Sequence, residues 1–234
     1  MNISNQQHQT LAAVAWDMDG TLLNSEPIWE RITYELSESL GKRLTPELQA
    51  KTVGGSFRNT VAIAAHHAGV VLTETEFEDI QRECYTKLAT RLPYSKIFPG
   101  IRSCLQSLRE AKIPIAVVTN TARELAIPAL RGLGVELFDA IVCGDDISVG
   151  KPNPLGYQTA CAHLSVLPST VLVFEDSQAG MAAGLAAGCR VLAAPGAQLP
   201  LPQEVHAMPQ ASFVGVTAPQ IQQWFAELST QSHT

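Results

Sequence analysis

Segments with strand patterns and segments with helix patterns alternate from residue 98 onward, and this alternation constrains the fold most. Short apolar runs predict buried strands at residues 115–118, 140–143, 171–174, 190–194 and 212–216. Helical patterns lie between or after them, at residues 101–111, 123–133, 154–164, 180–187 and 218–228. Strands that alternate with helices predict an α/β fold, a doubly wound, Rossmann-like parallel sheet.

An earlier apolar run, residues 11–16, supplies a further strand of this sheet. It ends in Asp17-Met18-Asp19-Gly20-Thr21, which places two carboxylates directly after a buried segment. Ligands of open α/β sheets bind at the carboxyl ends of the strands, so these acids are candidates for a functional site. The alternative is an ordinary polar turn, because Asp and Gly are common turn residues.

A helical block separates this first strand from the later alternation. Helix patterns begin at Pro27, Thr45, Ser56 and about Thr75, and Pro93 ends the last of them. The block is much longer than an ordinary connection between two elements. The sequence therefore predicts an inserted α-helical cap at residues 25–92 and a core made of residues 1–24 and 93–234.

Composition narrows the class of protein. The chain has 234 residues, 46% of them hydrophobic, and a net charge of −6, which fits a globular core and argues against a nucleic-acid partner. Five separated cysteines predict buried, reduced thiols. The polar first ten residues and the lack of a long apolar segment predict a cytoplasmic protein without a signal peptide or membrane contact, as a monomer or weak dimer.

Several polar residues follow the predicted strands, and parallel strands would bring them to one edge of the sheet. They are Asp17, Asp19, Thr119, Asn120, Lys151, Glu175 and Asp176. Carboxylates on neighbouring strands form a hard oxygen site suited to Mg²⁺, and a carboxylate is also a covalent nucleophile for phosphoryl transfer. Each member alone has an ordinary interpretation, as a solvated loop lysine, a helix cap or a helix start. Their joint order favours an active site.

The four stretches Asp17 to Thr21, Thr119-Asn120, Lys151-Pro152 and Glu175-Asp176-Ser177 closely resemble the four motifs of the haloacid dehalogenase superfamily. The resemblance implies that Asp17 is the nucleophile and Asp19 the general acid and base. It implies that Mg²⁺ is bound by Asp17, by Asp176 and by the backbone carbonyl of Asp19. Thr119, Asn120 and Lys151 would bind the phosphoryl group, and Glu175 would lie in the outer shell of the metal.

The helical insert resembles the cap of the β-phosphoglucomutase and phosphoglycolate-phosphatase-like branch. Because Asp19 is present, dehalogenation is disfavoured. The mutases place a histidine where this chain has Trp29 and a lysine near Gln81, so a phosphatase is favoured over a mutase. The expected substrate is a small phosphorylated sugar, polyol or hydroxy acid. The alternatives are a phosphosugar mutase and a non-catalytic binding module on the same fold.

The cap is expected to select the substrate. Gly54 and Gly55 are predicted to approach the active site, with Arg58 as a contact for an anion. The alternative for Arg58 is a solvent-exposed position on a helix. Trp29 is predicted to pack inside the cap rather than to stack on a substrate.

Overall fold

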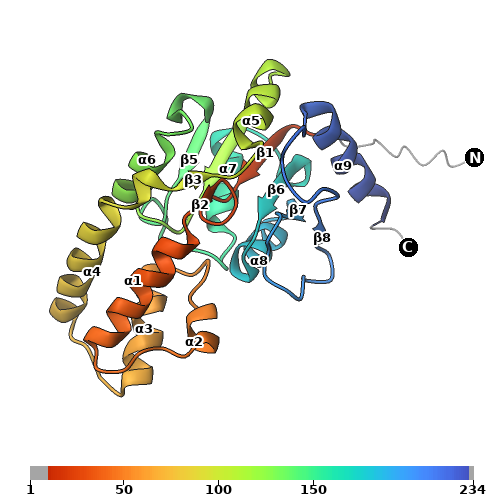
Figure 1. The fold of residues 1–234 in the computed structure, drawn as a ribbon. Helices are drawn as coiled ribbons and strands as arrows, with labels where there is room; N and C mark the ends of the chain where they lie inside the picture. The colour runs from red at the N-terminus through yellow and green to blue at the C-terminus, as the bar shows by residue number, and fades with distance from the viewer. Residues whose placement is uncertain (1–9, 232–234) are drawn as a thin grey trace, which may run out of the picture.

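The computed structural model describes residues 10–231, with side chains described up to residue 228, and its centre is a six-stranded parallel sheet (Figure 1). The strands are β1 (Ala13–Trp16), β4 (Ile115–Val118), β5 (Ala140–Val142), β6 (Val171–Glu175), β7 (Arg190–Ala193) and β8 (His206–Ala207). Their order is β5-β4-β1-β6-β7-β8, with β1 between β4 and β6. The predicted parallel α/β fold is confirmed.

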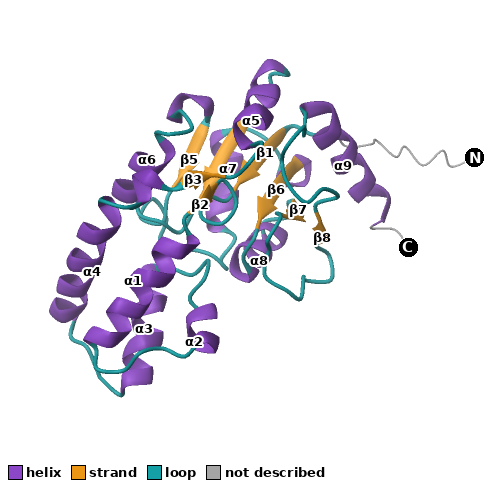
Figure 2. Ribbon diagram, viewed as in Figure 1, coloured by secondary structure: helices purple, strands orange, loops and turns teal. Residues whose placement is uncertain are grey.

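Helices cover both faces of this sheet, as Figure 2 shows. Alternate residues of β1 face opposite sides: Val14 and Trp16 belong to one buried cluster, and Ala13 and Ala15 to the other. The first cluster includes residues of α5 (Ile101–Glu110), α6 (Arg123–Leu130) and α9 (Ala218–Gln231). The second includes residues of α7 (Leu155–His163) and α8 (Gln178–Ala186). Both faces are apolar, as expected for a parallel sheet.

Four further helices form a bundle beside the sheet (Figure 1), called here the helical insert. They are α1 (Glu26–Ser39), α2 (Pro46–Ala50), α3 (Phe57–Ala68) and α4 (Glu74–Ala89). The insert leaves the sheet at β2 (Leu23–Asn24) and returns at β3 (Lys96–Ile97), and these two strands pair antiparallel. Its entry and exit are therefore adjacent. The proposed division into two domains remains a prediction.

Side-chain caps fix the starts of the insert helices. Thr45 and Ser56 accept hydrogen bonds from the backbone N–H of the third residue of α2 and α3, respectively. Thr73 and Glu76 form a complete capping box at the start of α4. Short 3₁₀ helices occur elsewhere, at η1 (Leu92–Tyr94), η2 (Val135–Leu137) and η3 (Pro168–Thr170).

The predicted strand at residues 212–216 is wrong, and the edge strand is β8 instead. Phe213 and Val216 are buried, so the apolar pattern was real, but the segment forms a turn in which Val216 N donates to Phe213 O at 3.1 Å. Gly215 has a φ of +78°, a left-handed conformation that breaks an extended strand. Burial here comes from a turn that packs on the core.

The sequence analysis also made predictions about the cysteines, about membrane spans and about a signal peptide. All five cysteines are free and buried, as expected. None of the helices within residues 10–231 combines the length and the apolar character needed to cross a membrane. The polar residues that argue against a signal peptide lie almost entirely outside the described range.

Candidate active site

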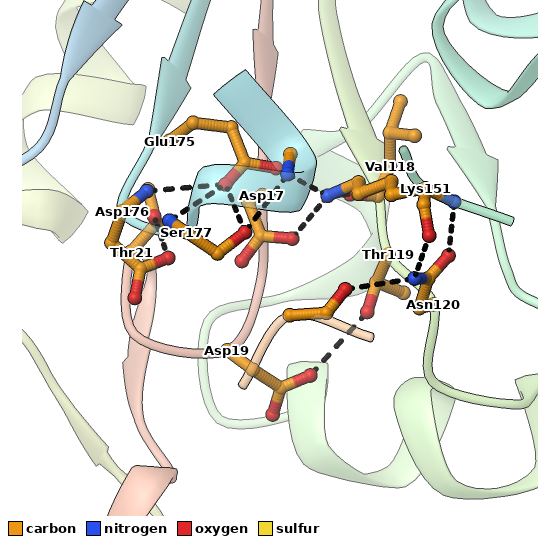
Figure 3. Close-up of polar contacts among 12 residues, drawn as sticks. Asp17, Asp19, Thr21, Val118, Thr119, Asn120, Lys151, Glu175, Asp176 and Ser177 are labelled. Atoms are coloured by element: carbon orange, nitrogen blue, oxygen red, sulfur yellow. Dashed lines mark hydrogen bonds and ion pairs between the residues drawn. The ribbon is translucent and has the colours of Figure 1, made fainter. Parts of the chain in front are cut away.

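The polar residues predicted from the strand ends meet at one edge of the sheet (Figure 3). They come from the last residue of β6, from the loops after β1, β4 and β6, and from the loop between β5 and α7 that carries Lys151. Residues a hundred or more positions apart therefore touch directly, as Lys151 does with Asp17 and Thr119 with Asp19. The parallel sheet produces this convergence, because its strands end on the same side.

Lys151 lies at the centre of the group, with its side chain only 2% exposed. Its ammonium contacts the Asp17 carboxylate, donates to Glu175 Oε1 at 2.5 Å and donates to the Val118 carbonyl at 2.8 Å. Burial alone would lower the pKa of this amine, but the charges of Asp17 and Glu175 outweigh burial and raise it. Lys151 is therefore a fixed cation, which excludes the solvated-loop interpretation.

Acidic groups outnumber the cation that faces them. Burial raises the pKa of Asp17 well above its usual range; Lys151 opposes this rise, whereas Glu175, Asp176 and Asp19 add to it. Burial also raises the pKa of Asp176, with the charges of Glu175 and Glu26 as further causes. Three buried carboxylates with one lysine leave an excess of negative charge, which a bound cation would compensate.

Glu175 is held entirely by protein groups. Its Oε1 accepts from Lys151 and from the Tyr157 hydroxyl at 2.8 Å. Its Oε2 accepts from the backbone N–H groups of Asp176 and Ser177 and from the Ser177 hydroxyl, at 3.1 to 3.2 Å. A Cβ at Gly180 would lie 1.8 Å from Oε1, so only glycine leaves room for this carboxylate. Sequence reasoning missed Tyr157, which no motif marks.

The carboxylates of Asp17, Glu175 and Asp176 offer oxygens that all lie within 4.8 Å of one another. Hard oxygen donors at this spacing fit a Mg²⁺ ion. Because both Glu175 oxygens are occupied, Asp17 and Asp176 are the candidates for direct ligands. Asp176 is fixed by the Thr21 hydroxyl, which donates to its Oδ1 at 3.1 Å. The Asp19 side chain is not part of this cluster, so a metal contact by Asp19 would use its backbone carbonyl.

The Asp19 side chain turns instead toward the helical insert and the loop after β4. Its Oδ1 accepts from the Ser25 hydroxyl at 2.5 Å and from the Trp29 indole N–H at 2.9 Å. Its Oδ2 accepts from the hydroxyls of Thr121 at 2.7 Å and Thr119 at 3.3 Å. Trp29 packs against the buried cluster that includes insert residues such as Ile32 and Leu36, and its N–H also reaches the site, which the sequence did not indicate.

Asn120 connects three segments of the chain through its side-chain amide. Its Nδ2 donates to the carbonyls of Gly54, at 2.8 Å, and Lys151, at 3.2 Å, while its Oδ1 accepts from Lys151 N–H at 2.9 Å. The amide therefore holds the Lys151 loop and one loop of the insert. A phosphate contact by Asn120 remains a prediction and would involve its backbone N–H.

The predicted residues of the insert separate into two groups. Gly54 and Gly55 line a pocket that also contains Asp17 and Asp19. Arg58 does not line that pocket; it is exposed, ion-paired with Glu74 and stacked on the Phe77 ring at 3.9 Å. The structure thus supports the alternative interpretation of Arg58, a position on the surface of α3.

Comparison with known proteins gives the family. Residues 14–194 match the family described as haloacid dehalogenase-like hydrolase. The chain belongs to this family. The match covers every motif residue from Asp17 to Asp176, which confirms the resemblance and the predicted hydrolase class.

Two curated relatives in the haloacid dehalogenase-like family illustrate its range. The phosphorylated carbohydrates phosphatase of Thermotoga maritima is 32% identical over 179 residues, covering 76% of this chain and 82% of that protein. The phosphoglycolate phosphatase of Chromobacterium violaceum is 32% identical over 190 residues, covering 78% of this chain and 84% of that protein.

Solved structures confirm the fold of the haloacid dehalogenase-like chain. β-Phosphoglucomutase from Clostridium difficile superposes with a TM-score of 0.81 at 19% identity, covering 94% of this chain and 99% of that one. CbbY from Rhodobacter sphaeroides, in complex with phosphate, has a TM-score of 0.75 at 26% identity, covering 87% of this chain and 95% of that one.

Proposed function

We propose that this chain is a Mg²⁺-dependent phosphatase that hydrolyses a small phosphorylated metabolite through an aspartyl-phosphate intermediate. Membership of the hydrolase family and relatives named as phosphatases support phosphoric monoester hydrolysis. The observation that carries the proposal is the contact of buried Asp17 with Lys151, beside a second carboxylate, Asp19, held in a separate network. Two carboxylates in different surroundings can serve different chemical roles.

Asp17 is the proposed nucleophile. An Asp17 oxygen attacks phosphorus, the bond between phosphorus and the ester oxygen breaks, and the phosphoryl group remains on Asp17. Lys151 contacts the same carboxylate and is held as a cation, so it can stabilise the negative charge of the phosphoryl oxygens during transfer. Thr119, whose side chain lies next to Asp19, is the proposed hydroxyl contact for the phosphoryl group.

Asp19 is the proposed general acid and base. It donates a proton to the leaving ester oxygen in the first step and takes a proton from water in the second. That water attacks phosphorus, the bond to Asp17 breaks, and inorganic phosphate leaves. Four hydrogen bonds fix the carboxylate before reaction, which reduces the cost of orienting it.

The proposed ion would be held by the carboxylates of Asp17 and Asp176 and by the Asp19 carbonyl. When bound, Mg²⁺ neutralises phosphoryl charge and orients the group for in-line displacement. Asp17 and Asp176 supply hard oxygen ligands within the acidic cluster, while Lys151 and Tyr157 hold Glu175 beside them. The excess of buried acid in this cluster supports the fit of a divalent cation.

A mutase remains the alternative. Trp29 occupies the position at which the resemblance places a mutase histidine, and its N–H is bonded to Asp19, which favours hydrolysis. Localisation in the cytoplasm, the monomeric or weakly dimeric state and the absence of a nucleic-acid partner remain predictions from composition.

Phosphate release from a panel of phosphorylated sugars, polyols and short acids, with Mg²⁺ or EDTA, tests the proposal. We expect release that needs Mg²⁺ and that falls at least about a thousandfold in Asp17→Asn, because the nucleophile is lost. Asp139→Asn, in an exposed ion pair far from the motifs, is the matched control and keeps its activity. Interconversion of hexose phosphates without release would support the mutase, and release by Asp17→Asn at the normal rate would contradict the aspartyl-phosphate route.

A further inference from the structure

The pocket that contains Asp17 and Asp19 has a wall supplied by the helical insert. This wall offers hydroxyl, amide and aromatic groups together with one carboxylate. The residues on which the inference depends are Glu26, Trp29, Thr33, Gln49, Thr60 and Tyr85. A leaving group bound beyond the phosphate would lie against these side chains.

No lysine, arginine or histidine is among the residues that line this pocket in the described part of the chain. Two arginines of the insert, Arg58 and Arg82, border a neighbouring hollow instead. Both are already paired, Arg58 with Glu74 and Arg82 with Asp79. The insert therefore presents no unpaired arginine to an anionic substituent at the pocket wall.

Glu26 is the one charged residue that the insert contributes to the wall. It is partly buried in the first turn of α1, close enough to Asp19 for their charges to interact. Among residues 10–231 its carboxylate has no hydrogen-bond or ion-pair partner. The Glu26 carboxylate is therefore available to accept a hydrogen bond from a ligand in the pocket.

We infer that the pocket selects a neutral, polyhydroxylated leaving group, that Glu26 accepts a hydrogen bond from one of its hydroxyls, and that carboxylate-bearing leaving groups are rejected. The inference rests on the proposed phosphatase function and narrows its substrate class. Sugar and polyol phosphates satisfy it, and phosphorylated hydroxy acids do not. Threonine hydroxyls and Gln49 offer further partners for the remaining hydroxyl groups.

Electrostatics in the pocket support the same selection. Burial, followed by the charges of Asp19 and Glu30, raises the pKa of Glu26 to about 7. A substrate carboxylate placed beside Glu26 would meet the same burial and the same neighbouring charges. Like charges brought together in a binding site disfavour the complex strongly, so discrimination of at least about tenfold is expected.

Matched substrate pairs isolate the charge from size and shape. Hydroxyethyl phosphate differs from phosphoglycolate, and glycerol 3-phosphate from 3-phosphoglycerate, by an alcohol in place of a carboxylate. We expect kcat/KM to be at least about tenfold higher for the alcohol of each pair. p-Nitrophenyl phosphate serves as the reference, because its leaving group carries neither a hydroxyl nor a carboxylate.

Glu26→Gln removes the charge while keeping the shape of the side chain. The alcohol-to-acid ratio of kcat/KM should fall about tenfold in this variant, because repulsion of the acid is relieved and the acceptor is weakened. Hydrolysis of p-nitrophenyl phosphate by the same sample reports whether the variant is folded. Glu83→Gln, in the exposed ion pair with Lys87 on α4 and outside the pocket lining, is the control and should keep the wild-type ratio.

The outcomes separate this inference from the proposed function. Hydrolysis of the acids as efficiently as the alcohols would overturn the inference, and so would an unchanged ratio in Glu26→Gln. No release from any compound, p-nitrophenyl phosphate included, would overturn the phosphatase proposal itself and this inference with it.

Discussion

The indole N–H of Trp29, in the helical insert, donates a hydrogen bond of 2.9 Å to the carboxylate of Asp19, in the loop after β1. This bond joins the element that covers the site to the carboxylate proposed as general acid and base. The Ser25 hydroxyl, from the start of α1, donates to the same oxygen. Movement of the insert away from the sheet would remove both donors, so the position of α1 is coupled to the position of Asp19.

Trp29→Phe tests this coupling, because it keeps an aromatic ring and removes the N–H. We expect kcat/KM for an alkyl phosphate to fall about tenfold, since one donor that orients the acid is lost. p-Nitrophenyl phosphate needs little proton donation to its leaving group and should be affected less. Equal losses for both substrates would indicate a structural effect. Phe57→Leu, another aromatic change in the pocket wall, is the control for altered packing.

Lys151→Met should reduce both activity and stability. It leaves the buried carboxylates of Asp17 and Glu175 without their cation, which costs about 3–5 kcal/mol of unfolding free energy in the metal-free protein. Arg109→Met breaks the more exposed pair with Asp139 and should cost less than about 1 kcal/mol. Urea unfolding in EDTA measures both values, and a similar small loss in the two variants would contradict a structural role for Lys151.

The motifs at the strand ends were predictable, because a parallel sheet brings residues that follow different strands to the same edge. Asp17 and Thr119 needed only the strand assignments and the rule that parallel strands end on one side, whereas Lys151 lies well inside the loop after β5 and was placed by the resemblance of its motif. The adjacent sequence also marks such residues as candidates; Asp17, for example, begins a pair of acids that follows an apolar run.

Contacts made by residues outside the motifs were not predictable, because they depend on how the helices and loops pack around the sheet. Trp29, Thr121 and Tyr157 belong to no motif, and each reaches the site from a helix or loop whose pattern indicates only packing. Arg58 shows the converse, since proximity to Gly54 in sequence suggested a site contact that the ion pair with Glu74 replaces.

Glu26 should make stability depend on pH in the metal-free protein. Its folded pKa of about 7 lies above the ordinary value of 4.5, so the folded state binds more protons between these values and loses stability as pH rises through them. Glu26→Gln should therefore be more stable than the wild type by about 1–3 kcal/mol at pH 8 and no more stable below pH 4.5. Thermal unfolding in EDTA measures this, and a pH-independent difference would contradict it.

Gly54→Ala should impair the fit of the insert against the sheet. Gly54 has a φ of +72°, and an added Cβ would lie 2.3 Å from the Ser177 hydroxyl oxygen, next to Asp176. Gly69→Ala is a matched control, because Gly69 has the same φ of +72° but nothing within 4 Å of the added atom. Both variants share the backbone strain of about 1 kcal/mol, and only Gly54→Ala forces the loop away from the site.

We expect kcat/KM to fall at least about tenfold in Gly54→Ala and to stay near the wild-type value in Gly69→Ala. Equal effects would assign the loss to strain alone.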